Sequence, residues 1–412
     1  MNPTNEYFME ILRAFVQETN MPVRSDVNWK SVFHLAQIHS VFGIVGYMIK
    51  KLPSQEVPRN EVSDKLMRGY NSTVISQSGR AVAMEYLEQK YSEADIPCVP
   101  MKGYIIRDFY PIPELRTYGD IDFLILPEDR KKSHEIMLAN GYICDHKELG
   151  GDVYIYKSPG GWERYEIHTR LLSYNPNRNF NYTAYAETAW THVKLTESGL
   201  YRFTAEFHMI YVFLHLAKHC SSYGAGVRMF MDVALIMKNS PPINWCAVID
   251  ELQKLRLGEF LTVTSALCEC WFGVSPPFEI DISVDPYIYE EICNYIISGG
   301  TFGFENTNDI ARRLKRANDA LGEVSDGRIK RLAIIQDFFP RYTFMLNRYP
   351  ILKKVPVLMP ICWIIRLLDS VIRYDGAGIK RLKQLFRYSK IKTNKSYSMM
   401  KAMGLNSKKR KK

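Results

Sequence analysis

The sequence lacks a run of apolar residues long enough to cross a membrane. In its most apolar region, the longest stretch without a charged residue extends from Val355 to Ile365, covers 11 residues and contains two prolines. A spanning helix needs about 20 apolar residues. The first residues, Met-Asn-Pro-Thr-Asn-Glu, also lack the basic segment and apolar core of a secretion signal. We therefore expect neither a transmembrane span nor a signal peptide.

The sequence also lacks the cysteine pattern of a disulfide framework or a zinc site. Its eight cysteines are scattered, and the one close pair, Cys268 and Cys270, has no second pair at zinc-site spacing. Buried free thiols in a reducing compartment are the favoured interpretation, so we expect a cytoplasmic protein. A P-loop is missing as well, because the glycine-rich stretch 299–303 follows no predicted strand and has no P-loop lysine.

Basic charge is concentrated in a tail. The chain has a net charge of +10, but residues 372–412 hold 14 Lys and Arg against one acid, Asp375, and account for +13. The rest of the chain is close to neutral and has no general nucleic-acid footprint. The tail suggests a polyanionic partner, either RNA or an anionic membrane. The apolar segment 349–373 before it is a core helix or, alternatively, a helix lying at the membrane interface, which would make the protein peripheral to the membrane.

The hydrophobic pattern predicts an α+β protein with a small mixed sheet flanked by helical regions. Helical periodicity dominates residues 1–90 and 201–345, and the apolar helix and basic tail occupy 346–412. Between them, residues 91–200 alternate strand and helix signals. Strands are expected at 96–101, 121–126, 152–157 and 162–170, with helices at 104–110 and 127–140. Further helices are expected at 306–321 and 327–338.

Two aspartates open the second predicted strand, in the segment Tyr-Gly-Asp-Ile-Asp-Phe-Leu-Ile. Because side chains alternate along a strand, Asp120 and Asp122 share a face and Ile121 points into the core. Paired carboxylates and phosphate oxygens are typical ligands of Mg²⁺. The strand at 162–170 carries Glu166 and His168 on one face. If it pairs with 120–126, Glu166 joins the aspartates, and three carboxylates can hold one or two Mg²⁺ ions.

Basic groups and glycine around these strands are candidates for phosphate binding. Lys102 and Gly103 end the first strand and open a helix, and Arg116 could add a forked donor. His168 is a candidate for direct contact with the nucleotide or, alternatively, a satisfied histidine in the cleft wall. Farther along, His215, Lys218 and His219 share one helix face. They either border the cleft and contact nucleotide or acceptor, or they are structural.

The run from Met101 to Ile125, Met-Lys-Gly-Tyr-Ile-Ile-Arg-Asp-Phe-Tyr-Pro-Ile-Pro-Glu-Leu-Arg-Thr-Tyr-Gly-Asp-Ile-Asp-Phe-Leu-Ile, resembles the signature of the uncharacterised nucleotidyltransferase family within the DNA polymerase β-like superfamily. Tyr-Glu-Ile-His at 165–168 is similar to its third-carboxylate strand. The resemblance implies Mg²⁺ and an NTP such as ATP. By position, it implies that Asp120, Asp122 and Glu166 are the metal ligands and that Lys102 and Gly103 hold phosphate. Lys-Gly-Tyr stands where the wider superfamily usually has Gly-Ser or Gly-Gly.

We therefore expect a metal-dependent nucleotidyltransferase that releases pyrophosphate. The acceptor is open between a small molecule, a protein and an RNA. The alternative is a catalytically silent nucleotide-binding or interaction protein on the same fold.

Overall fold

The computed structural model describes residues 2–148, 150–158, 161–172, 182–221, 224–240, 242–281, 286–300, 335, 338–372, 399–400 and 402–405. The helices expected at 306–321 and 327–338 lie outside these residues, apart from Ile335 and Phe338, and so does most of the basic tail. Within the described ranges, no helix is both long and apolar enough to cross a membrane.

A five-stranded mixed sheet lies at the centre of the α/β part, which confirms the expected α+β class. Its strands run in the order β1-β2-β5-β4-β3. Strands β2 and β5 are parallel neighbours, and the other pairs are antiparallel. The bounds are β1 Val99–Pro100, β2 Asp120–Leu124, β3 Ile143–Glu148, β4 Gly151–Ser158 and β5 Gly161–His168.

Strands β2, β4 and β5 confirm the sequence prediction, whereas the strand expected at 96–101 shrinks to the two residues of β1. Strand β3 was not predicted, because its sequence Ile-Cys-Asp-His-Lys-Glu is mostly polar and its side chains are mostly exposed at the sheet edge. A separate hairpin was also missed; it consists of β6 Val193–Leu195 and β7 Tyr201–Phe203.

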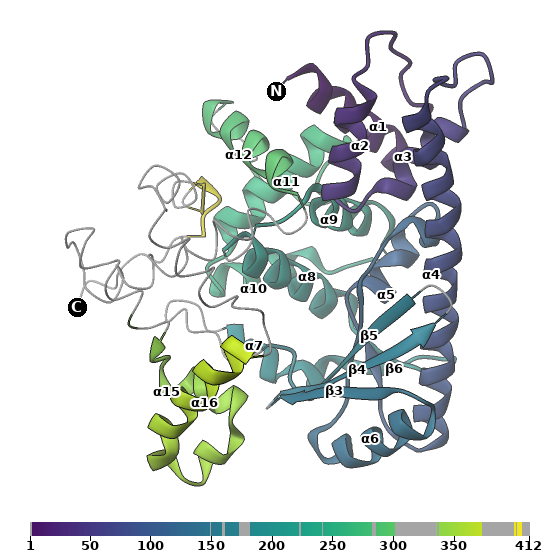
Figure 1. Ribbon diagram of the computed structural model, residues 1–412. Helices are drawn as coiled ribbons and strands as arrows, with labels where there is room; N and C mark the ends of the chain where they lie inside the picture. Colours follow the sequence, from purple (N-terminus) through teal and green to yellow (C-terminus); the bar gives the residue numbers. More distant parts are fainter. Residues whose placement is uncertain are drawn as a thin grey trace.

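Two helices cover one face of the sheet. Helix α4, Glu61–Glu93, runs along one side of the molecule, and α6, Arg130–Ala139, lies near its C-terminal end (Figure 1). Ile121 and Phe123 of β2 pack against Met84 and Met137 from these helices in one buried cluster. The odd positions of β2 thus form the core, as the alternation predicted, and the even positions face the other side.

The other side of the sheet is covered by a large helical body. One continuous hydrophobic cluster joins Leu124 of β2 to helices from both ends of the chain. These are α1 Pro3–Val16, α2 Trp29–Ile38, α3 Phe42–Lys50, α8 Ala205–Cys220, α9 Val227–Asn239, α10 Trp245–Lys254, α11 Gly258–Phe272 and α12 Pro286–Gly299. The N-terminal and later helical regions therefore share a core, and the division into four regions along the chain stays a prediction.

Short elements connect these parts. The helix expected at 104–110 divides into α5 Gly103–Ile106 and the 3₁₀ turn η1 Arg107–Phe109, and the helix expected at 127–140 into η3 Pro127–Asp129 and α6. The others are η2 Pro113–Leu115, α7 Tyr182–Glu187, η4 Ala189–His192, α15 Tyr342–Arg348, η5 Pro350–Lys353, η6 Pro356–Leu358 and α16 Met359–Ile372.

His39 joins three helices of the shared core. It follows α2 and is fully buried. Its Nδ1 accepts a hydrogen bond from the Val227 amide at the start of α9, over 3.1 Å, so its Nε2 donates to the Ile297 carbonyl of α12, over 2.9 Å. The ring must be neutral to make both bonds. Burial accordingly lowers the pKa of His39 to about 4.

This histidine predicts a pH dependence of stability. An unfolded histidine takes up a proton below about pH 6.5, whereas His39 in the folded chain stays neutral down to about pH 4. Its contribution to the free energy of unfolding is therefore complete above pH 6.5 and is lost as the pH falls toward 4. In denaturant titrations between these pH values, His39→Gln should show a shallower loss of stability than the wild type. An unchanged slope would contradict the assignment.

Candidate metal and nucleotide site

Two carboxylates meet at the centre of the sheet because of the register of β2 and β5. Asp122 lies directly opposite Glu166, and Leu124 lies opposite His168. The strands are parallel, so the even positions of both point to the same side of the sheet. The expectation that the strand at 162–170 pairs with the Asp-Ile-Asp strand is confirmed.

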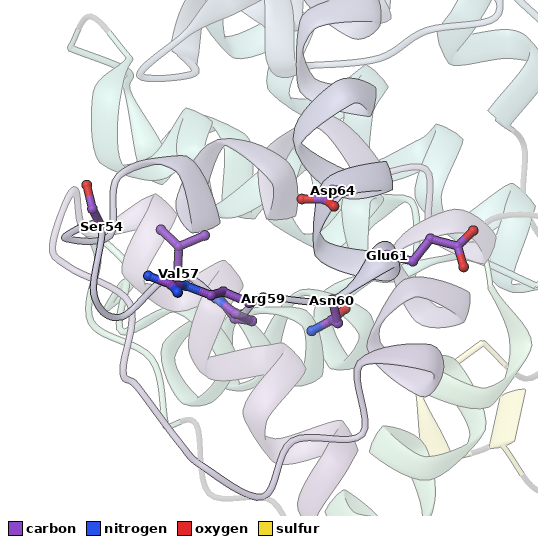
Figure 2. Close-up of a pocket in the computed structure, with 7 residues that line it drawn as sticks. Ser54, Val57, Arg59, Asn60, Glu61 and Asp64 are labelled. Atoms are coloured by element: carbon purple, nitrogen blue, oxygen red, sulfur yellow. The ribbon is translucent and has the colours of Figure 1, made fainter.

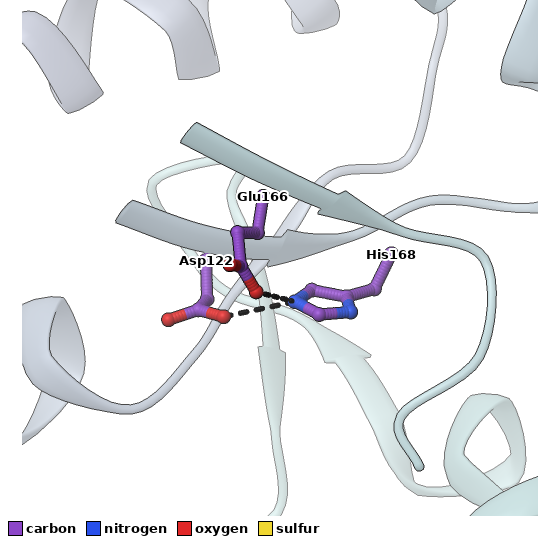
Figure 3. A group of neighbouring side chains, drawn as sticks. All are labelled: Asp122, Glu166 and His168. Atoms are coloured by element: carbon purple, nitrogen blue, oxygen red, sulfur yellow. Dashed lines mark hydrogen bonds and ion pairs between the residues drawn. The ribbon is translucent and has the colours of Figure 1, made fainter. Parts of the chain in front are cut away.

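The His168 imidazole faces both carboxylates with one ring nitrogen (Figure 3). Its Nε2 is 2.8 Å from Oδ1 of Asp122 and 3.6 Å from Oε2 of Glu166. Ligand atoms of the three residues all lie within 4.8 Å of one another. Among the described residues, this is the group of three or more side chains that could hold a metal ion. Asp122 is only 5% exposed, whereas Glu166 and His168 remain accessible.

Lys102 supplies a second cation to the same aspartate. Its ammonium binds Oδ1 of Asp122, the oxygen that also contacts His168. Burial alone would raise the pKa of Asp122, but Lys102, followed by His168, holds that pKa well below its usual range. Burial likewise acts to lower the pKa of Lys102, but Asp122 raises it above its ordinary value. Both side chains are therefore charged at neutral pH.

The backbone at Lys102 is strained. Its φ is +51°, in the left-handed region that non-glycine residues rarely adopt. Such a conformation costs on the order of 1–3 kcal/mol and is often found at functional sites. The residue joins β1 to α5 at this bend, and the bend directs the ammonium toward Asp122.

Asp120 lies at the exposed edge of the site. Its nearest cation is Arg164, whose Nε is 3.8 Å from Oδ1 of Asp120 and 3.0 Å from Oε1 of Glu166. Burial first, and then Glu166 and Asp122, raise the pKa of Asp120. His168, rather than Asp120, completes the group of close ligand atoms. The predicted role of Asp120 in metal binding stays a prediction.

Arg164 was not recognised in the sequence. The sequence contained a signal for it, because Arg164 lies two residues before Glu166 and therefore on the same face of β5. In the structure, Arg164 lies directly opposite Asp120.

Arg116 and Gly103 have structural partners. The Arg116 guanidinium binds Asp232 of α9 through two bonds, at 3.1 and 2.6 Å, and both side chains are buried. Tyr110 donates a third hydrogen bond to Asp232 at 2.7 Å. A Cβ at Gly103 would collide with Arg116 and Tyr118, so this position must be glycine for packing alone. The predicted phosphate contacts of Arg116 and Gly103 remain predictions, and the structure gives each residue another reason to be there.

One face of α8 borders the carboxylates, as the helical spacing of its polar residues suggested. Tyr211, His215 and Lys218 all interact electrostatically with Lys102 and Asp122. Burial and then His219 lower the pKa of His215 well below its usual value. Lys218 remains accessible to solvent, although crowding by protein and the charge of Lys102 lower its pKa. The His215 and His219 rings lie 4.5 Å apart. Tyr211 was missed because an isolated tyrosine in an apolar helix carries no pattern.

A surface pocket of about 480 Å³ lies elsewhere, at the start of α4 (Figure 2). It is lined by Ser54, Val57, Pro58, Arg59, Asn60, Glu61 and Asp64. Asn60 is already used as the helix cap, since its side chain accepts hydrogen bonds from the amides of Val62 and Ser63. Asp64 is 16 residues before Arg80, which binds the carbonyl of Tyr118. At 1.5 Å per residue, this is about 24 Å along the helix. The pocket is therefore not part of the carboxylate site.

Residues 25–273 match the family described as uncharacterised nucleotidyltransferases. The chain belongs to this family. The matched segment contains every residue of the carboxylate site and the α8 face. No curated protein and no solved structure matches the chain.

The donor set of this nucleotidyltransferase family member fits a divalent cation. Two carboxylates offer the hard oxygen ligands that Mg²⁺ prefers, and the imidazole is a ligand that Mn²⁺ or Zn²⁺ also accepts. Lys102 and His168 both contact Oδ1 of the buried Asp122, so a cation at this oxygen has to compete with both groups.

This competition can be measured. Lys102→Met removes the ammonium from Asp122, and one competing charge near a buried site is worth more than about 1.4 kcal/mol. The dissociation constant for Mn²⁺ should therefore fall at least about tenfold in calorimetric titrations. Lys157→Met, at an exposed position of β4, is the matched control and should bind as the wild type does. Equal or weaker binding by Lys102→Met would show that the ammonium does not compete.

Proposed function

We propose that the chain is a Mg²⁺-dependent nucleotidyltransferase that moves an NMP group from an NTP to a nucleophilic acceptor. The observation that carries this proposal is the close approach of Asp122, Glu166 and His168, whose ligand atoms lie within 4.8 Å of one another on two adjacent parallel strands. Membership of the nucleotidyltransferase family supports it. ATP is the nucleotide to test first.

Asp122 and Glu166 would hold the ion, with Asp120 joining them from the same face of β2. This carboxylate set can accommodate one or two Mg²⁺ ions. A divalent cation supplies positive charge to the triphosphate and acidifies an attacking hydroxyl. His168 would orient Asp122 through the 2.8 Å contact of its Nε2 with Oδ1, and the same nitrogen lies 3.6 Å from Oε2 of Glu166.

The chain's own cations would hold the triphosphate. The flexible side chain of Lys102 would rotate and move its ammonium from Asp122 to a phosphate oxygen. Lys218 approaches from α8 and remains accessible. The acceptor oxygen forms a bond to the α-phosphorus, the bond from that phosphorus to the bridging oxygen of the β-phosphate breaks, and pyrophosphate leaves. The acceptor proton passes to solvent or to a neighbouring base.

The acceptor stays open between a small molecule, a protein hydroxyl and an RNA end. The α8 face, with neutral His215 and His219, is the wall that it would meet opposite the carboxylates. A catalytically silent nucleotide-binding protein is the second candidate, favoured by the direct bond between Lys102 and Asp122, which neutralises the aspartate without a metal.

Transfer of label from α-labelled NTPs, and pyrophosphate release with Mg²⁺, test the proposal. Asp122→Asn and Glu166→Gln should each reduce the rate by more than about 100-fold, since even residues that only support metal ligands change activity by about 10- to 100-fold. Glu163→Gln is the matched control. Glu163 lies on the same strand, and its carboxylate binds the Tyr165 hydroxyl on the opposite face.

Two results would count against the enzyme. Full activity in Asp122→Asn would place the chemistry elsewhere. Calorimetric binding of NTP without transfer to water, to the protein itself or to any offered acceptor would favour the silent nucleotide-binding protein.

A further inference from the structure

Residues 338–372 form a small C-terminal lobe with a core of its own. Figure 1 shows α15 and α16 side by side, apart from α4 and from the N-terminus. Met345, Leu352 and Cys362 are buried within the lobe, and Met359 and Trp363 of α16 pack against them. Trp363 Nε1 donates to the Pro340 carbonyl at 3.0 Å, and the Tyr342 hydroxyl donates to the Leu352 carbonyl at 2.6 Å. These bonds hold the lobe together.

Helix α16 is apolar on two opposite faces, and only one of them is covered. Met359, Cys362 and Trp363 follow helical spacing and point into the lobe. A second row with the same spacing lies about half a turn around the helix from the first row, and its side chains are exposed. The row comprises Ile361 at 53%, Ile364 at 58%, Ile365 at 46% and Leu368 at 55%. One face of α16 therefore belongs to the core of the lobe, and the opposite face is exposed.

More apolar side chains of the lobe are exposed near this row in the sequence. They belong to α15 and to the segments before and after it, and they are Phe339, Tyr342, Phe344, Ile351, Val355 and Val357, with Val357 83% exposed. Exposed apolar side chains gathered in one small lobe mark a surface that binds something.

The charge of the lobe restricts what that partner can be. From Phe338 to Ile372 the sequence contains five basic residues and one acid, Asp369. The basic residues are Arg341, Arg348, Lys353, Lys354 and Arg366. The segment leads directly into residues 372–412, with 14 Lys and Arg against one Asp. A lobe that combines an exposed apolar row with this excess of positive charge along its sequence is complementary to anionic lipid, where each cation near the surface adds to the attraction.

We propose that the exposed face of α16 docks on an anionic membrane surface, with the helix lying in the plane of the interface. Its 14 residues are too few for the roughly 20 that a spanning helix needs, so the helix lies along the surface and its apolar row enters the boundary between headgroups and acyl chains. A second copy of the lobe would bring like charges together. RNA binding relies on phosphate contacts and on stacking against aromatic rings, and a row of Ile and Leu contributes to neither.

Sedimentation of the full chain with phosphatidylcholine vesicles, with and without phosphatidylserine, tests this surface. The wild type should bind the anionic vesicles, bind the neutral ones much more weakly, and be partly released by added salt. Ile364→Ser combined with Leu368→Ser should weaken binding by at least about tenfold, because two large aliphatic side chains no longer leave water. Both positions are exposed, so the thermal stability of the variant should match that of the wild type.

The matched control is Ile75→Ser combined with Val82→Ser on α4. These two aliphatic side chains are 76% and 64% exposed and lie outside the lobe, so their replacement should leave vesicle binding unchanged.

Three outcomes would overturn the proposal. The first is that the wild type binds neither kind of vesicle. The second is that the Ile364/Leu368 variant binds as tightly as the wild type, which would assign the attraction to the basic tail alone. The third is a dimer in analytical ultracentrifugation that the same variant dissociates, which would show that a second copy covers the face.

Discussion

A buried carboxylate needs positive charge beside it, and Asp122 imposes that requirement on the whole site. At 5% exposure it has little water to stabilise its charge. Lys102 and His168 both contact one of its oxygens, and Glu166 lies opposite it on the neighbouring strand. This requirement gives a reason for the strained backbone at Lys102, because the bend there directs the ammonium toward Asp122.

A second constraint holds the segment that leads into Asp122. Between η2 and β2, the carbonyls of Thr117 and Tyr118 accept hydrogen bonds from Arg228 of α9 and Arg80 of α4. Arg116, just before them, is fixed by Asp232. A buried pair of this kind contributes little net stability but is costly to break. Helices from both sides of the sheet thus fix where β2 begins, and with it the position of the carboxylates.

The sequence predicted the parts of the site that follow from local periodicity. The alternation along a strand placed Asp122 on the open side and Ile121 and Phe123 in the core, and the Tyr-Glu-Ile-His segment placed Glu166 and His168 on one face. The resemblance to the nucleotidyltransferase family was confirmed. Strand β3 was not predicted from the sequence, because an edge strand can be polar on both faces and then shows no hydrophobic alternation.

Contacts between distant segments could not be predicted. Arg116 and Asp232 are 116 residues apart, and nothing in either local sequence indicates that they meet. Arg116 was therefore interpreted from its chemistry alone, as a phosphate donor. The same limit applies to His39, whose two hydrogen bonds connect segments 188 and 258 residues away. Local patterns predict which face a side chain occupies, whereas its partner across the core depends on how the helices pack.

The charges of the site are arranged so that metal and nucleotide would depend on each other. Lys102 and Arg164 pair with the carboxylates of Asp120, Asp122 and Glu166, and His168 contacts Asp122. If a cation took the place of Lys102 at Asp122, the ammonium would be left inside the protein without its partner, at a cost of several kcal/mol. A triphosphate supplies that partner. The triphosphate would therefore lower the free-energy cost of binding the metal ion at Asp122, and the metal ion would lower the cost of binding the triphosphate. By linkage, each would raise the affinity for the other. Lys-Gly-Tyr in place of Gly-Ser gives Asp122 a counter-ion from within the chain, and a metal ion at Asp122 would have to exchange with it.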